Sequence, residues 1–133
     1  MAGSTPLSTA PLQRGVVFFA HGSRDPLWRA PIEAVALALK QQHAHALCAC
    51  AYLELNDPDL ATACGDLIAQ GCAAITVLPM FLGTGRHARN DLPALVEALR
   101  LQHPHVEFSI ATAVGEDDRI TQLLAAIAAE HIA

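Results

Sequence analysis

The sequence predicts a three-layer α/β sandwich, in which a four-stranded parallel sheet carries helices on both faces. Short apolar runs alternate with longer helical patterns in the order β-α-β-α-β-α-β-α, which is typical of parallel sheets. The expected strands are continuously apolar, as strands covered on both faces must be. Ala and Leu dominate while aromatic residues make up only 5% of the chain, a composition that suits helices packed on a sheet.

The first half of the chain contains two strand-helix pairs. We expect a strand over 15–20, a helix over about 30–42, a strand over 47–54 and a helix ending near 70. Asp57 and Pro58 predict the start of the second helix, because Asp caps helices and Pro tolerates the first helical position. Gly71 is expected to end this helix, since glycine commonly follows a helix C-terminus.

The second half repeats this alternation. Strands are expected over 73–79 and 106–112, and helices from about 90 to 102 and from about 117 onward. Asn90 or Asp91 is predicted to cap the third helix, with Pro93 in its first turn. Asp117 or Asp118 is predicted to cap the fourth helix. The apolar residues of that helix share one face: Ile120, Leu123, Leu124 and Ile127.

Length and charge narrow the possible functions. The 133 residues form one expected domain over 15–133, preceded by a flexible leader over 1–14. This leader lacks the features of a secretory signal, and no apolar run is long enough to span a membrane. The net charge of −5 argues against nucleic-acid binding, which depends on phosphate neutralisation.

The four cysteines are Cys48, Cys50, Cys64 and Cys72, and they form no C-x-x-C motif. We expect them to be buried free thiols rather than a metal or redox site. Free thiols indicate a reducing compartment, most simply the cytoplasm.

Polar side chains follow the ends of three expected strands. His21 comes after the first strand, Glu54 after the second and His87 after the third. Ligands of open α/β sheets bind at the carboxyl edge of the strands. Each histidine taken alone could be structural, but together with Glu54 they form a candidate His-His-carboxylate metal set with open positions for a substrate. Neutral imidazole suits both a borderline-soft metal and proton transfer near neutral pH.

The basic residues point to an anionic ligand at this same edge. Only 8 residues are Lys or Arg, and four of them lie in or beside the loops after the first and third strands: Arg24, Arg29, Arg86 and Arg89. Guanidinium groups bind carboxylates bidentately, so the expected ligand is a polycarboxylate. Gly83 and Gly85 flank Thr84 in a loop whose backbone can approach a ligand closely. That loop lacks the Gly-Lys-Ser/Thr of a phosphate-binding P-loop, and no dinucleotide fingerprint follows the first strand.

The remaining histidines are interpreted as structural. Four of them precede the second and fourth strands, at the opposite edge of the sheet: His43, His45, His103 and His105. We expect these to be exposed turn residues. His131 lies near the end of the fourth helix, where a cation is favourable.

The segments at the predicted site resemble the CbiX/SirB family of sirohydrochlorin chelatases, relatives of class II ferrochelatase. The similar segments are 20–26, 51–58, 79–87, 91–93 and 115–117, and the resemblance covers nearly everything from Gly15 onward. It implies a chelatase-like (flavodoxin-like) fold. It also implies insertion of a divalent metal into sirohydrochlorin, Co²⁺ for cobalamin biosynthesis or Fe²⁺ for sirohaem biosynthesis. A related short form inserts Ni²⁺.

The resemblance also implies roles for individual residues. His21 and His87 would be metal ligands, and His21 would in addition accept a proton. The tetrapyrrole would contact the loop from Leu82 to Arg86 and the positions of Glu54 and Leu55. Arg24 and Arg89, with Arg86, would hold its carboxylates. Three roles stay open for Glu54: it would stabilise the imidazolium, complete the metal site or relay protons.

The length of the chain resembles the short, single-lobed form of the family, which implies a homodimer. No Cys-rich or His-rich tail is present, so an iron–sulfur cluster is not expected, and the reaction requires no nucleotide or organic cofactor. The affinity order of divalent metals for such ligands favours nickel and copper over cobalt and iron, whereas two histidines disfavour magnesium.

Two other classes of function stay open. One is a non-catalytic metal-carrying or tetrapyrrole-binding module, and the other is a mononucleotide binder, which the missing phosphate motif argues against.

Overall fold

The computed structural model describes residues 13–132 and contains one parallel four-stranded sheet in the order β2-β1-β3-β4. Its strands are β1 (Arg14–Ala20), β2 (Leu47–Tyr52), β3 (Ala74–Pro79) and β4 (Glu107–Ile110). The helices are α1 (Ala30–Gln42), α2 (Leu60–Ala69), α3 (Arg86–Gln102) and α4 (Asp118–Ala129), with a short 3₁₀ helix η1 (Val114–Glu116) before α4. The predicted alternation and the parallel sheet are confirmed.

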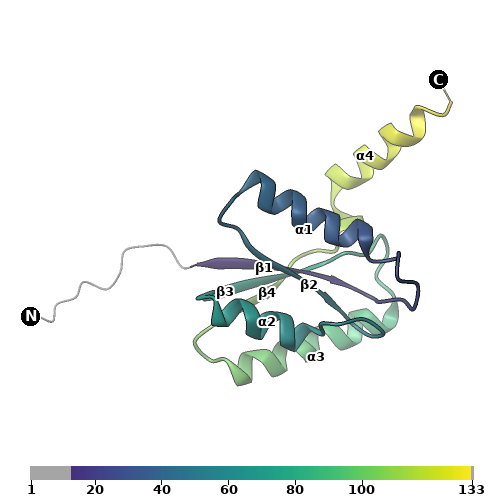
Figure 1. Ribbon diagram of the computed structural model, residues 1–133. Coiled ribbons are helices and arrows are strands. Elements are labelled where there is room, and N and C mark those ends of the chain that lie inside the picture. The colour runs from purple at the N-terminus through teal and green to yellow at the C-terminus, as the bar shows by residue number, and fades with distance from the viewer. Residues whose placement is uncertain (1–12, 133) are drawn as a thin grey trace, which may run out of the picture.

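The core lies between the sheet and the α2–α3 layer (Figure 1). Side chains at alternate strand positions point to this layer, as the two-residue period of a strand requires. The core includes Val17, Phe19, Ile75, Val77 and Phe108 from the strands and Leu67, Val96 and Leu99 from the helices. This layer anchors the strand ends that carry the predicted site residues.

The other face of the sheet is covered unevenly. Helix α1 lies against β1 and β2 on that face, whereas α4 extends away from the sheet (Figure 1). None of the residues of α1 or α4, all of which the structure describes, is buried. Helices on both faces are therefore confirmed, but no helix among residues 13–132 lies over β3 and β4 on the α1 side.

The third helix begins five residues before the start predicted from Asn90 as its N-cap. Gly85 is its N-cap, and Pro93 lies inside the helix rather than in its first turn. The physical reason is an apolar stripe that starts upstream of the proline, formed by the buried residues Ala88, Leu92, Val96 and Leu99. Burial of this stripe outweighs the helix-breaking tendency of one proline.

The start of the second helix also differs from the prediction. Asp59, not Asp57, is the N-cap, and its carboxylate accepts a 2.8 Å hydrogen bond from the backbone N–H of Thr62. The Asp57–Pro58 peptide bond is cis and precedes the helix. At the fourth helix the prediction is confirmed, because Asp117 caps α4 by accepting from the N–H of Arg119 at 2.8 Å.

Strand boundaries shift by one or two residues. β2 ends at Tyr52 rather than Glu54, and β4 ends at Ile110 rather than at residue 112. The predicted leader lies mostly outside the described residues. Its last residue, Arg14, belongs to β1, and the carbonyl of Gln13 accepts from the N–H groups of residues 73 and 74 at 2.9 and 3.1 Å.

All four cysteines are free thiols, as predicted. Three are buried and Cys50 is half-buried. Burial raises the pKa of Cys64 to about 12 and is the main cause that raises the pKa of Cys50 to about 11. No helix within the described part of the chain is long and apolar enough to cross a membrane.

Candidate functional site

The loops at the carboxyl edge of the sheet are joined by backbone hydrogen bonds. The N–H of Glu54, after β2, donates to the carbonyl of His21, after β1, at 3.0 Å. In the β3–β4 half of the sheet, the N–H of Gly115, after β4, donates to the carbonyl of Phe81, after β3, at 2.9 Å. Between the two central strands, the N–H of Met80, directly after β3, donates to the carbonyl of Phe19 in β1 at 2.8 Å, so the strand ends and their loops form one rim.

Gly22 makes the closest approach between two of these loops. Its φ is +107°, and a Cβ built on it would lie 1.7 Å from the carbonyl oxygen of Glu54. Only glycine fits both the backbone conformation and the space. Beside it, the N–H of Ser23 donates to the Asn56 side-chain oxygen at 2.7 Å. These contacts hold the backbone on either side of His21 and Glu54 in a fixed position.

His21 is half-buried and lies against an aromatic side chain. The centroids of its ring and the ring of Phe81 are 4.4 Å apart, with an interplanar angle of 32°. Phe81 is buried and makes an edge-to-face contact with Phe19 at 6.2 Å. Neither imidazole nitrogen of His21 hydrogen-bonds to another residue within 13–132 in the structure. Both nitrogens can therefore serve a metal ion or a proton.

The predicted His-His-carboxylate set is not assembled as a three-ligand group. Within the described residues, no three His, Cys, Asp or Glu side chains lie close enough together to hold a metal ion. His87 is exposed in the first turn of α3, and the side chain of Glu54 is exposed at the end of β2. The contact that the structure shows between His21 and Glu54 is the hydrogen bond between their backbones.

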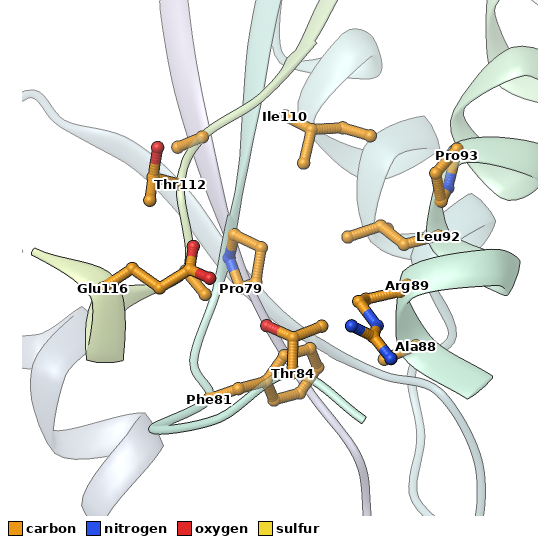
Figure 2. A pocket seen from close by; sticks show the side chains of 12 residues that line it. Pro79, Phe81, Thr84, Ala88, Arg89, Leu92, Pro93, Ile110, Thr112 and Glu116 are labelled. Carbon is orange, nitrogen blue, oxygen red and sulfur yellow. The ribbon is translucent and has the colours of Figure 1, made fainter. Parts of the chain in front are cut away.

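A cavity of about 280 Å³ opens beside the β3 and β4 ends of this rim (Figure 2). Two predicted substrate-binding residues, Thr84 and Arg89, line it, and Glu116 lies opposite Arg89 across the opening. The remaining lining is mostly apolar: Pro79, Phe81, Ala88, Leu92, Pro93, Ile110, Ala111, Thr112 and Ala113. The sequence analysis did not select these residues as site residues, because they fit the strand and helix patterns. Only the fold shows that they line a cavity.

Three of the four predicted arginines are exposed and uncommitted. Arg24, Arg86 and Arg89 have no carboxylate within ion-pair distance among residues 13–132. Arg29 differs, since its guanidinium lies 3.8 Å from Glu33 and is thereby engaged within the chain. The first three can bind an external anion without breaking an internal ion pair.

Large apolar side chains project from the same rim. Leu27, Leu55 and Leu82 are 77%, 56% and 70% exposed, and they follow β1, β2 and β3 in turn. We name these three residues the apolar rim. Leu55 has a φ of 67°, which is unusual for a bulky residue and typical of functional sites. Leu55 and Leu82 were predicted to contact a ligand, whereas no sequence pattern singled out Leu27.

The glycines of the loop after β3 have open space around them. A Cβ at Gly83 or Gly85 would meet no atom within 4 Å. Steric crowding by the rest of the described chain therefore does not require glycine at these two positions. Their small size leaves room beside Thr84 for a ligand to approach the backbone.

Comparison with known proteins identifies relatives both in sequence and in fold. The CbiX family model matches residues 15–131. The sirohydrochlorin cobaltochelatase of Saccharolobus solfataricus is 32% identical over 116 residues, which cover 83% of this chain and 89% of that protein. The cobaltochelatase of Priestia megaterium is 25% identical over 111 residues, which cover 84% of this chain but only 36% of that protein.

Two solved structures share the fold. A cobalamin (vitamin B12) biosynthesis CbiX protein from Marinobacter aquaeolei is 32% identical with a TM-score of 0.78, covering 90% of this chain and 97% of that one. The sirohydrochlorin chelatase SirB from Bacillus subtilis subspecies spizizenii, in complex with cobalt, is 28% identical with a TM-score of 0.66. It is matched over 80% of this chain and 46% of its own. The chain therefore belongs to the CbiX family.

Proposed function

We propose that this protein is a chelatase, a lyase that inserts a divalent metal ion into sirohydrochlorin, with Co²⁺ as the first choice and Fe²⁺ as the second. The observation that carries the proposal is the composition of the carboxyl rim. There the apolar rim, three uncommitted arginines and the half-buried His21 gather at one edge of the sheet. The cobaltochelatase relative at 32% identity and the cobalt complex of SirB support cobalt.

The rim matches the chemistry of the proposed substrate. Sirohydrochlorin is a macrocycle with an apolar ring face and carboxylates around its periphery. Leu27, Leu55 and Leu82 are suited to contact the ring, because removing exposed apolar surface from water is favourable. Arg24 and Arg89 are suited to bind the peripheral carboxylates through bidentate hydrogen bonds.

The reaction replaces two inner N–H protons of the macrocycle by one divalent ion. His21 and His87, as neutral imidazoles, hold the ion on one side of the ring before transfer. One nitrogen lone pair cannot bind a metal and a proton together, so His21 accepts a ring proton only after the ion has moved across. The exposed carboxylate of Glu54 stabilises the resulting imidazolium or passes the proton to solvent.

The test is anaerobic insertion of Co²⁺ into sirohydrochlorin, followed by absorbance. His21→Ala is expected to lower the insertion rate by about 100-fold or more, the usual contribution of a positioned acid–base group. His87→Ala is expected to lower the rate because one of the two metal ligands is lost. The matched control is His45→Ala, because His45 is exposed at the opposite edge of the sheet. Unchanged rates in both rim variants would remove the assigned roles.

The number of turnovers separates an enzyme from a carrier. Many equivalents of product per chain support the chelatase, whereas one equivalent or less with the tetrapyrrole retained supports a metal-carrying or tetrapyrrole-binding module. Rates with Co²⁺, Fe²⁺ and Ni²⁺ under the same conditions identify the preferred metal. The proposed reaction uses the ion as substrate and requires no nucleotide, organic cofactor or iron–sulfur cluster.

We further propose that the protein acts as a homodimer in the cytoplasm. The chain matches only 46% of SirB and 36% of the Priestia megaterium relative, so two copies supply about as much chain as one of these longer proteins. Four free thiols support a reducing compartment. Sedimentation gives the mass, and a fluorescent fusion in the source cell gives the location. A 14.1 kDa species would contradict the homodimer.

A further inference from the structure

The segments that follow β1 and β2 interlock at the carboxyl rim. The N–H of Glu54 donates to the carbonyl of His21 at 3.0 Å. The N–H of Ser23 donates to the side-chain oxygen of Asn56 at 2.7 Å. Gly22 lies between these two bonds, and a Cβ built on it would come within 1.7 Å of the Glu54 carbonyl oxygen and 3.3 Å of Asn56 Oδ1. Asn56 therefore adds a side-chain contact to a joint whose other contacts are between backbone atoms.

Asn56 also closes a strained turn around Leu55. The backbone N–H of Asn56 donates to the carbonyl of Glu54 at 2.8 Å, which makes a turn of three residues. Leu55 at its centre has a φ of 67°, so the turn is of the classic γ type, which is rare and strained. Leu55 is 56% exposed, so its own packing does little to offset that strain. The turn keeps a large apolar side chain at the rim instead of in the core.

A relay of hydrogen bonds continues from Ser23 to Leu27. The Ser23 hydroxyl accepts from the N–H of Asp25 at 3.1 Å, and the Asp25 carboxylate accepts from the N–H of Leu27 at 2.9 Å. Local bonds of this kind between side chain and backbone order the loops that connect regular elements. The relay begins at Asn56, because Asn56 holds the N–H of Ser23. Asn56 is thereby linked to two residues of the apolar rim, Leu55 and Leu27.

We propose that Asn56 is a positioning residue that holds these two leucines at a fixed place relative to His21. The inference rests on the proposed function, since it takes Leu27 and Leu55 as contacts of the macrocycle and His21 as the ligand of the metal ion. The backbone of Asn56 closes the turn around Leu55, and its side chain ties that turn to the loop of His21 and Leu27.

Metal insertion makes the reaction sensitive to this link. The ring nitrogens must lie within bonding distance of the ion when the ion leaves the imidazole of His21. A misplacement of about 1 Å between reacting groups can cost about 100-fold in rate. Loss of the Asn56 side chain uncouples the contacts of the ring from the ligand of the ion, so it should lower the rate of insertion without removing a group that touches either of them.

The test compares Asn56→Ala with Asp59→Ala, which lies on the same connection between β2 and α2. Each substitution removes one side-chain oxygen that accepts a backbone N–H, at 2.7 Å from Ser23 and at 2.8 Å from Thr62. Asn56 is bonded to the loop of His21, whereas Asp59 caps α2. Asn56→Ala is expected to lower kcat for Co²⁺ insertion at saturating sirohydrochlorin by about 10- to 100-fold. It should also raise the Kd of metal-free sirohydrochlorin by about 3-fold or more, because the rim is less preorganised. Asp59→Ala should keep both values close to those of the wild type, and urea unfolding verifies that both variants fold.

Asn56→Asp provides the rescue. An aspartate side chain has the same length and accepts the N–H of Ser23, so kcat should return to within about 3-fold of the wild type. The proposal is overturned if Asn56→Ala keeps the wild-type kcat and Kd, if Asp59→Ala loses as much kcat, or if Asn56→Asp is no faster than Asn56→Ala.

The two measurements separate this proposal from the proposed function. A wild type that binds sirohydrochlorin without inserting metal contradicts the chelatase, and the Kd of Asn56→Ala then decides the role of Asn56. A wild type that inserts metal as fast as Asn56→Ala contradicts the role of Asn56 alone. A wild type that binds no sirohydrochlorin contradicts both.

Discussion

Gly22 offers the sharpest test of how the rim is built. In Gly22→Ala, the new Cβ would lie 1.7 Å from the carbonyl oxygen of Glu54 and 2.9 Å from its carbon, at a φ of +107°. No flexible side chain can yield, because both atoms are backbone. The loop after β1 or the loop after β2 must therefore move.

The cost can be worked from these contacts. Holding a non-glycine residue in a sparsely populated backbone region costs about 1–3 kcal/mol. Moving the Glu54 backbone also disturbs its 3.0 Å hydrogen bond to the carbonyl of His21, which contributes about 1 kcal/mol. The free energy of unfolding should fall by about 2–4 kcal/mol, a large part of the stability of a single domain.

The assay is urea unfolding followed by circular dichroism. With a slope of about 2 kcal/mol per molar urea, the midpoint should fall by about 1–2 M. Gly83→Ala is the control, because a Cβ there meets no atom within 4 Å, and its effect should stay within about 0.5 kcal/mol. A Gly22→Ala midpoint equal to that of the wild type would refute this account of the loop contact.

Three further predictions concern stability and reactivity. Gly65→Ala should raise the free energy of unfolding by about 0.5–1 kcal/mol, because Gly65 lies inside α2 with open space around it; a destabilised variant in urea unfolding would contradict this. Asp59→Ala should cost about 1 kcal/mol at pH 7 through loss of the α2 cap. Hydrogen bonds from Thr62 hold the pKa of Asp59 below its usual 3.8. This stabilisation is therefore present above pH 3.8 and lost as the pH falls through the lowered value, so the difference between variant and wild type should shrink in acid. Cys64 and Cys50, with pKa values raised to about 12 and about 11, should resist a thiol reagent at pH 8 in the native protein and react promptly in urea; fast labelling of the native protein would show that these thiols are accessible.

Local sequence features predicted most of the fold. The strands were recognised as short apolar runs, of which β1 and β2 pack against helices on both faces, and α1 begins and ends where the pattern placed it. The errors occurred where tertiary packing outweighs a local signal. Pro93 indicated a helix start, yet the buried stripe that begins at Ala88 extends α3 upstream. Asp57 indicated a cap, yet Asp59 provides it.

The candidate site was predicted in its location but not in its details. The order of strands places His21 and Glu54 at one edge, and this follows from the alternation alone. The cavity beside Arg89 and Glu116 depends on how α3 and η1 pack around the ends of β3 and β4, which no spacing reveals. The exposure of Leu27 likewise depends on the path of its loop.

The sequence by itself determined the parallel α/β architecture and the edge of the sheet at which the candidate site residues lie, because these follow from periodicity and chain order. Only the tertiary structure decided which apolar residues stay exposed. Apolar periodicity shows which residues share a helix face, but not what that face packs against. Leu123 and Leu124 share the apolar face predicted for the fourth helix, yet the packing leaves them exposed on α4.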